Sequence, residues 1–457
     1  MTDHTRESTR ELYTDVGNAR RFVDQHGSDL RFCKAWGKWL IWDGVRWCVD
    51  DTGVVERKAK ATIRAMYQEA SRVEDSGDRQ DYVQHALKSE YAGRIQSMIS
   101  MAETEDGIPV RPGDLDKDGL LFNCLNGTVD LRTGKMREHR REDLISRLAP
   151  VNFDPDAKCP VFDRFLEKIM EDDPTLIQYS QRCIGYALSG DVSEQCMFVL
   201  FGSGANGKTT FLEAIRHTLG DYAGQVPVRT LMTKRGDGIS NDIAQLKGRR
   251  FITSSEVEAG QRLAEAQVKE LTGGGMLQGR FLYHEPFHFE PTFKIFMDCN
   301  HKPEIGGVDE AIWRRVKLIP FSVTIPKAER DRKLQEKLRA EAPGILAWAV
   351  RGHQEWRGGG LREPRKVEEA TGAYRKEMDI VAEFIDEECV LEGSASQTSG
   401  DLYDAYKEWC KSKVEEPVSK KAFGMRLKDV PGVVDQKVGG KRSWRGIGFK
   451  ETAKKAA

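Results

Sequence analysis

Residues 196–222 read CMFVLFGSGANGKTTFLEAIRHTLGDY, and the order of an apolar run, a glycine-rich loop and an amphipathic segment sets the fold class. The continuous apolar run over 196–201 is typical of a buried parallel strand. The loop that follows has the pattern G-x-x-x-x-G-K-T, and apolar residues at helical spacing then predict a helix that ends near Gly220. Strand, loop and helix are the setting of a phosphate-binding loop.

In such a loop, backbone N–H groups and the helix N-terminus surround the phosphates. Lys208 is expected to reach the β- and γ-phosphates, and Thr209 to hold magnesium through its hydroxyl. We therefore predict binding of ATP and Mg²⁺; the alternative is a glycine-rich turn that binds nothing. The predicted nucleotide-binding residues are Gly202, Ser203, Gly204, Ala205, Asn206, Gly207, Lys208, Thr209 and Thr210.

Further apolar runs at 251–253, 295–297 and 316–319 predict an α/β core. Glu256 follows the first of these runs, where a strand would deliver a catalytic carboxylate and magnesium ligand; the alternative is a solvated carboxylate. Asn300 follows the second and could contact the γ-phosphate or orient the attacking water. The sequence Asn300-His301-Lys302-Pro303 also fits a turn, and local sequence does not separate the two interpretations.

Arg314 and Arg315 directly precede the run at 316–319. Two arginines beside a buried strand are costly unless they have anionic partners. A guanidinium supplied to a neighbouring subunit's γ-phosphate would stabilise charge in the transition state, which requires an oligomer. The alternative is a local salt bridge.

Composition excludes several classes of protein. The 457 residues suggest about three domains. The nine cysteines form no C-x-x-C pair, which argues against a disulfide framework or a structural zinc site and favours a reducing cytoplasm. No apolar run reaches membrane-spanning length, and the polar N-terminus is not a signal peptide, so we expect a cytoplasmic protein with no membrane partner. A net charge of -1 neither favours nor excludes nucleic-acid binding, which only local basic patches could indicate.

Two regions have the residue types that bind DNA. Segment 279–289 predicts a hairpin whose basic and aromatic residues could contact phosphates and bases; the alternative is a structural hairpin whose aromatic side chains fill a core, which is the role expected for Phe287 and Phe289. From Asp401 onward the chain holds 14 Lys and Arg against 8 Asp and Glu, which predicts duplex binding by a helix and a hairpin; the alternative is a solvated basic face. The predicted DNA-binding residues are Lys269, Arg280, Tyr283, His284, Lys420, Lys421, Arg426, Lys441, Arg442 and Arg445.

The segments GSGANGKTTFLEAI, LKGRRFITSSE, VKELTGG, GRFLY, DCNHKP and AIWRRVKLIPF occur in an order and spacing that resemble the superfamily-three helicases. More narrowly, they resemble the helicase part of phage and plasmid primase-helicases, whose relatives include the poxvirus primase-helicase. WDGVRW and LNGTVD resemble the region before that helicase. LYDAYKEWC, KKAFGMRL and KRSWRGIGF resemble its C-terminal winged-helix region.

The resemblance implies a P-loop NTPase (AAA+-like) core with a parallel sheet, and roles for individual residues. Lys208 and Thr209 match the Walker A pair, Glu256 the Walker B acid and Asn300 the sensor. One of Arg314 or Arg315 matches the arginine finger, and Arg315 is favoured. The family usually has Thr-Gly-Gly-Asp where this chain has Thr272-Gly273-Gly274-Gly275, so any role of that acid is in doubt here.

Five regions are expected: an N-terminal α+β domain over 1–155, a helical collar over 156–192, the ATPase core over 193–330, a helical connection over 331–378 and a winged-helix-like domain over 379–457. The region before the helicase contains no evident paired-acid polymerase motif, so priming activity is not expected.

The expected function is that of an ATP-dependent DNA helicase. It would translocate on single-stranded DNA as an oligomeric ring, a homo-hexamer, during replication of a phage, prophage or plasmid-like element. Expected partners are single-stranded and forked DNA, other copies of the chain, and a separate primase or initiator. The alternatives are a DNA-binding initiator or defence ATPase that does not unwind DNA, and a small-molecule P-loop kinase, for which the chain is too long.

Overall fold

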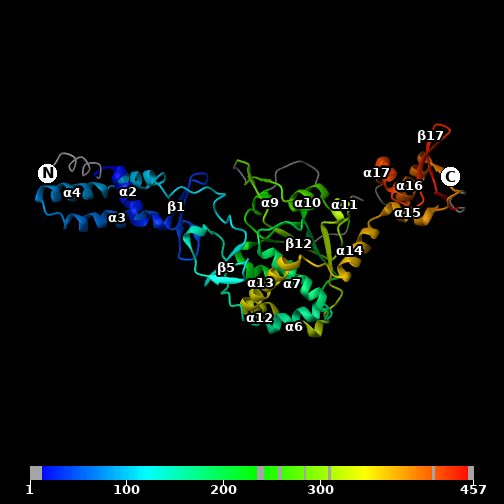
Figure 1. Cartoon of the computed structure of the whole chain (residues 1–457), viewed down its shortest axis with the longest axis horizontal. Coiled ribbons are helices and arrows are strands. Elements are labelled where there is room, and N and C mark those ends of the chain that lie inside the picture. The colour runs from blue at the N-terminus through cyan, green and yellow to red at the C-terminus, as the bar shows by residue number, and fades with distance from the viewer. Residues whose placement is uncertain are drawn as a thin grey trace.

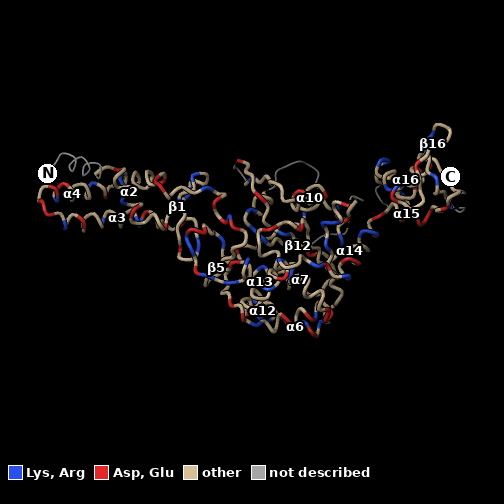
Figure 2. The backbone as a smooth tube through the Cα atoms, viewed as in Figure 1, with Lys and Arg blue, Asp and Glu red and all other residues tan. Residues whose placement is uncertain are grey.

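The computed structural model describes residues 13–233, 241–255, 260–281, 285–306, 310–413 and 417–450. It is elongated, with an N-terminal arm at one end, a central α/β region and a C-terminal lobe at the other end (Figure 1). Basic and acidic residues are interspersed along all three regions (Figure 2), in keeping with the net charge of -1. Within the described residues, no helix combines the length and apolar character needed to cross a bilayer.

In its described residues, the N-terminal arm combines four α-helices with a small antiparallel sheet. The helices are α2 (Asp15–His26), α3 (Val54–Ala70), α4 (Ser76–Ser89) and α5 (Ala92–Ala102), and the strands are β1 (Leu30–Cys33), β2 (Lys38–Trp42) and β3 (Trp47–Val49). The β2–β3 turn forms because Asp43 Oδ1 accepts hydrogen bonds from the backbone N–H groups of Val45 and Arg46, both at 2.8 Å. The arm has its own hydrophobic core, which extends from Ala19 to Ile108.

A second small sheet packs against the central region and also contacts the arm through Asn123 and Val45. It is a meander of β4 (Leu121–Cys124), β5 (Gly127–Asp130) and β6 (Lys135–Arg137). Buried residues between 122 and 153 share one hydrophobic cluster with the central helices. The buried guanidinium of Arg250 donates to the carbonyls of Leu121 at 2.8 Å and Leu188 at 2.6 Å. Apolar side chains on both sides of residue 155 thus share one core cluster.

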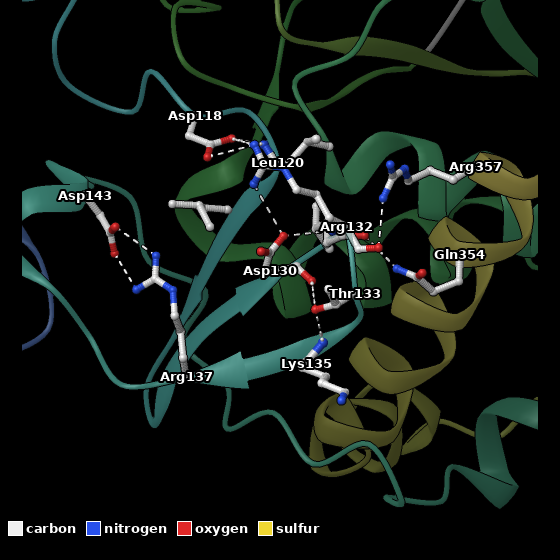
Figure 3. Close-up of polar contacts among 12 residues, drawn as sticks. Asp118, Leu120, Asp130, Arg132, Thr133, Lys135, Arg137, Asp143, Gln354 and Arg357 are labelled. Atoms are coloured by element: carbon white, nitrogen blue, oxygen red, sulfur yellow. Dashed lines mark hydrogen bonds and ion pairs between the residues drawn. The ribbon is translucent and has the colours of Figure 1, made fainter.

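The β5–β6 turn carries the polar contacts that fasten this meander to the central region (Figure 3). Arg132 pairs with Asp118 at 2.9 Å. The carbonyls of Leu131 and Arg132 accept hydrogen bonds from Gln354 at 2.6 Å and Arg357 at 2.8 Å, both on helix α13 (Ala342–Gly359). These bonds satisfy turn carbonyls that would otherwise lose their partners at the interface.

The central sheet has five parallel strands in the order β13-β7-β12-β9-β8. They are β7 (Met197–Phe201), β8 (Ala223–Gln225), β9 (Phe251–Ser255), β12 (Lys294–Cys299) and β13 (Val316–Pro320). The four predicted apolar runs all form strands of this sheet. Alternate residues face opposite sides: Phe198 and Leu200 belong to one core cluster, and Met197 and Val199 to the other. The predicted α/β class with a parallel sheet is confirmed.

Helices cover both faces of the sheet. The first cluster contains residues of α6 (Pro160–Ile169), α7 (Pro174–Leu188), α8 (Lys208–Leu219), α12 (Leu334–Ala340) and α13. The second contains residues of α10 (Glu265–Thr272), α11 (Glu310–Trp313) and α14 (Arg365–Glu377). Helices α7 and α13 cross closely at two glycines: a Cβ added to Gly185 would lie 2.1 Å from the backbone nitrogen of His353, and one added to Gly352 would lie 2.2 Å from the carbonyl oxygen of Gln181.

The C-terminal lobe follows α14 and has a separate aromatic-rich core that includes Phe384, Tyr406, Phe423 and Trp444. Its helices are α15 (Ile380–Glu388), α16 (Ser399–Lys413) and α17 (Lys420–Lys428). A three-stranded antiparallel sheet has the order β15 (Ser396–Thr398), β17 (Lys441–Arg445), β16 (Val434–Val438). Strands β14 (Cys389–Val390) and β18 (Gly448–Phe449) pair beside it.

Candidate nucleotide site and basic groove

The loop between β7 and α8 has the backbone shape that its sequence predicts. Gly204 and Gly207 take φ of 95° and 88°, in the left-handed region that favours glycine. Gly202 is required for a different reason: an added Cβ would lie 2.2 Å from Asn206 Nδ2 and 2.3 Å from the carbonyl oxygen of Phe321. The loop thus turns tightly at the carboxyl end of β7, and α8 begins directly at Lys208.

The side chain of Lys208 lies buried over this loop. Its Nζ donates to the carbonyl of Gly202 at 2.9 Å, to Asn206 Oδ1 at 3.0 Å and to Asn300 Oδ1 at 3.1 Å. Burial lowers the pKa of Lys208, and the carboxylate of Asp298 opposes that shift. Three neutral oxygens and one carboxylate therefore surround the Lys208 ammonium group at the N-terminus of α8. A phosphate bound at this helix end would take the place of some of these oxygens.

Asn300 follows the end of β12, as predicted, and β12 lies next to β7 in the sheet. The structure thus brings Asn300 and Lys208 together although 92 positions separate them. Glu256, predicted from the end of β9, lies outside the described residues. The register pairs Asp298 of β12 with Ser255, the last residue of β9.

Asp298 is a polar residue of this site that the sequence reasoning missed. Its carboxylate accepts a 2.6 Å hydrogen bond from Thr209 Oγ1 and lies 3.7 Å from Lys208 Nζ. Only 8% of Asp298 is exposed. The signal was present in the sequence, because a carboxylate inside the apolar run Phe293 to Cys299 requires a partner when that run is buried.

The two arginines lie at the opposite edge of the sheet from the loop. Both precede β13, which runs parallel to β7, and the Arg315 carbonyl accepts from the N–H of Met197 at the start of β7. Arg315 is 7% exposed and donates to Thr272 Oγ1 at 3.1 Å and to the Ala311 carbonyl at 2.6 Å. Arg314 is exposed, and its guanidinium approaches Gln195 Oε1 at 3.4 Å.

The predicted DNA hairpin contains strands β10 (Leu277–Gly279) and β11 (Phe287–Phe289), paired in antiparallel register. Phe289 is buried in the second core cluster and Phe287 packs against that cluster, consistent with the structural role assigned to them. Arg280 is exposed and Lys269 is half-buried. Tyr283 and His284 lie outside the described residues.

The C-terminal lobe contains a groove of about 730 Å³ between α17, the start of α16 and β17. Lys420, Lys421, Lys441 and Arg442 all line it, as does Lys428, which the sequence reasoning did not include among its binding residues. Ser399, Gly400 and Asp401 lie on the other side. The groove therefore gathers five cations on one surface.

Two predicted DNA-binding residues do not line this groove. Arg426 points to the α15 side of the lobe, where it pairs with the buried carboxylate of Asp379 and lies 3.7 Å from Asp429. Arg445 donates to the carbonyl of Gly393 at 3.3 Å. Arg442 lines the groove but also pairs with Asp435 at 2.6 Å. Local charge count could not separate cations that stabilise the lobe from cations that face its groove.

Across the described ranges, no group of three or more His, Cys, Asp or Glu side chains is arranged to hold a metal ion. Among the described residues, the Thr209 hydroxyl and the Asp298 carboxylate are hydrogen-bonded to each other beside the loop.

Comparison with known proteins gives matches over most of the chain. Residues 19–171 match a family described as D5 N terminal like, residues 376–455 match a family described as Poxvirus D5 protein-like, and residues 200–315 match a family of unknown function. The solved apo structure of the NrS-1 C-terminal region has 10% identity and a TM-score of 0.50, covering 92% of this chain and 96% of that one. This likeness supports the fold.

Curated relatives come from large DNA viruses. A putative helicase of Acanthamoeba polyphaga mimivirus is 32% identical over 324 residues, which is 65% of this chain and 34% of that protein. A putative helicase of Frog virus 3 is 26% identical, over 71% of this chain and 42% of that protein. A putative primase of African swine fever virus is 24% identical, over 65% and 34%. The chain thus spans less than half the length of these relatives, and its D5-type matches and viral relatives support a place in a poxvirus D5-like primase-helicase family.

Proposed function

We propose that this chain is an ATP-dependent DNA helicase that acts in the replication of a phage, prophage or plasmid-like element. The observation that carries the proposal is the convergence of Lys208, Thr209 and Asn300 on one glycine loop at the carboxyl edge of a parallel sheet. Ligands of open α/β sheets bind at that edge. The helicase names of the viral relatives support the same activity.

In this proposal the loop is the P-loop of an AAA+-like core. Backbone N–H groups of 202–209 surround the phosphates of ATP, Lys208 moves from its carbonyl partners to the β- and γ-phosphates, and Asn300 contacts the γ-phosphate or the attacking water. Magnesium would be held in part by Thr209 and would neutralise charge that develops on the phosphates. Glu256 remains the predicted catalytic carboxylate and magnesium ligand.

The position of the arginines favours an oligomer. Arg314 lies at the amino edge of the sheet, whereas the loop lies at the carboxyl edge, so Arg314 cannot serve the site of its own subunit. In a ring, each subunit would present this edge to its neighbour's nucleotide. The exposed Arg314 is better placed to do so than Arg315, which would have to leave a buried position and two hydrogen bonds.

DNA would contact two surfaces in this proposal. The β10–β11 hairpin would contact single-stranded DNA in the ring. The C-terminal lobe, as a winged helix, would place α17 and the β16–β17 wing against duplex DNA. Aromatic rings of this lobe, including Phe423 and Trp444, are buried and cannot stack on bases, so the lysine-rich groove suits phosphates of a duplex.

A second candidate follows from this groove: a DNA-binding initiator or defence ATPase that hydrolyses ATP on DNA without unwinding it. Purified protein incubated with Mg-ATP and a forked duplex separates the two functions, with ATP hydrolysis followed in the same samples. The helicase predicts strand separation coupled to hydrolysis. DNA-stimulated hydrolysis without strand separation would favour the initiator, and hydrolysis indifferent to DNA would contradict both.

A further inference from the structure

Asp298 is a buried charge in the middle of the central sheet. It is the fifth residue of β12, which lies between β7 and β9, and 8% of its surface is exposed. Burying a carboxylate costs several kcal/mol unless hydrogen bonds and counter-charges compensate it, on the order of the penalties known for buried ions. The compensation here comes from Thr209 Oγ1 at 2.6 Å and Lys208 Nζ at 3.7 Å, both from the start of α8.

The hydrogen bond has a direction that matters for metal binding. A carboxylate only accepts, so the Thr209 hydroxyl donates its proton to Asp298. The lone pairs of Thr209 Oγ1 are then free to face an ion beside the loop. Asp298 thus fixes the rotamer in which a threonine can ligate a cation.

P-loop NTPases pair the loop hydroxyl with an aspartate from a neighbouring strand, and the two hold Mg²⁺ together. On β9, the residue level with Asp298 is Ser255, which carries no charge. Asp298 occupies the same level on β12, one strand closer to β7. Among the described residues, the carboxylate that reaches the loop threonine comes from β12.

These two oxygens fit the needs of a nucleotide-bound magnesium ion. Mg²⁺ prefers octahedral oxygen coordination, keeps several waters, and is bound in such enzymes by one or two carboxylates together with the substrate's phosphates. A preformed cage of three acidic ligands is not needed, and none is present among the described residues. One hydroxyl held by one carboxylate is sufficient when ATP brings the other ligands.

We propose that Asp298 is the positioning residue of the magnesium site: it orients the Thr209 hydroxyl toward the ion of bound Mg-ATP and supplies the negative charge that attracts this ion. The inference rests on the proposed function, because it concerns the ATP site. From the sequence, an acidic residue of the magnesium site was expected only at the end of β9. The inference adds an acidic residue of that site on β12.

The test measures binding of a fluorescent, non-hydrolysable ATP analogue in EDTA and across a titration of free Mg²⁺. The variants are Asp298→Asn, Thr209→Val and the double variant, with Cys299→Ser as a matched control. Cys299 is the next residue of the same strand, is buried, and contacts the carbonyl of Leu200 at 3.7 Å rather than Thr209. Thermal unfolding checks that each variant is folded.

We expect Asp298→Asn to bind the analogue in EDTA as well as the wild type, since removal of a negative charge beside the triphosphate does not weaken its binding. The free Mg²⁺ concentration for half-maximal binding should rise about 10- to 100-fold, the usual effect of losing an outer-shell partner. Thr209→Val should show a similar rise, and the double variant no more than either single variant, because the two residues act as one unit. Cys299→Ser should match the wild type.

Two results would overturn the inference. One is an unchanged Mg²⁺ dependence in Asp298→Asn. The other is an equal loss of binding with and without Mg²⁺ in this variant, which would make Asp298 only the counter-ion of Lys208. If Asp298→Asn does not fold, Thr209→Val decides, because it leaves the Asp298–Lys208 pair in place. Failure of the wild type to bind the analogue under any condition would contradict the proposed function instead.

Discussion

Replacing His353 should change how the stability of the central region depends on pH. His353 lies on α13 with none of its surface exposed, and its Nδ1 is 3.0 Å from the carbonyl of Gly185. That carbonyl requires Nδ1 to carry the proton of the neutral ring. Nε2 is buried without a hydrogen-bond partner in the described part of the chain, so protonation would create a donor with no acceptor.

The pKa of His353 falls from 6.5 to about 4, mainly because the ring is buried; the hydrogen bond to the Gly185 carbonyl opposes this shift, and the nearby cations Lys294, Arg357 and Arg250 add to it. Below pH 6.5 the His353 ring binds a proton in the unfolded chain but stays neutral in the folded chain. The free energy of unfolding therefore decreases as the pH falls from 6.5 toward 4. Each unit of pKa difference corresponds to about 1.4 kcal/mol. Lowering the pH from 7.5 to 5.0 should therefore remove about 2 kcal/mol from the free energy of unfolding through this residue.

Urea unfolding at pH 7.5 and 5.0, followed by circular dichroism, measures this effect. The comparison is between the wild type and His353→Gln, whose amide keeps a donor for Gly185 and does not titrate. Other titrating groups contribute equally to both proteins, so the wild type should lose about 2 kcal/mol more than the variant over this pH range. An identical pH dependence in the two proteins would refute the buried, neutral state of His353.

Three further predictions concern packing, the basic groove and the arginines. Gly185→Ala should lower the free energy of unfolding by about 1–3 kcal/mol or more, because the added Cβ would lie 2.1 Å from the backbone of α13. Gly372→Ala in α14 is the control: its Cβ would meet none of the described residues within 4 Å, so this variant should not destabilise the protein. Urea unfolding measures both variants. Lys428→Ala should weaken duplex DNA binding and reduce the slope of log affinity against log salt by about 1, whereas Lys413→Ala, outside the groove and paired with Glu387, should leave the slope unchanged. Arg314→Ala should lower kcat for ATP hydrolysis roughly 10³-fold while nucleotide affinity stays within a few-fold, as expected for an arginine finger; unchanged kcat would contradict its role.

Local sequence was sufficient for the features that depend on neighbouring residues. The apolar run before Gly202 becomes β7, and the helical spacing after Lys208 becomes α8. Each of these depends on backbone preferences and burial over a few residues. Asn300 was found for the same reason, since it follows a strand whose apolar run is unmistakable.

What sequence reasoning missed depends on contacts between distant segments. Asp298 reaches Thr209 across 89 positions, and only strand order brings them together. The residues after 121 pack with the central helices because their apolar side chains face that core, which periodicity does not reveal. Arg426 was counted with the groove lysines, but Asp379 holds it elsewhere in the lobe.

Strand separation on a forked DNA duplex, measured for the wild type and Lys208→Ala side by side with Mg-ATP, decides whether ATP bound at residues 202–209 drives a helicase. The buried amine of Lys208 contacts the loop, Asn206 and Asn300, so its removal should abolish ATP hydrolysis and unwinding together while the C-terminal groove still binds duplex DNA. Unwinding or hydrolysis that persists in Lys208→Ala, or a wild type that hydrolyses ATP and leaves the fork intact, would contradict this account.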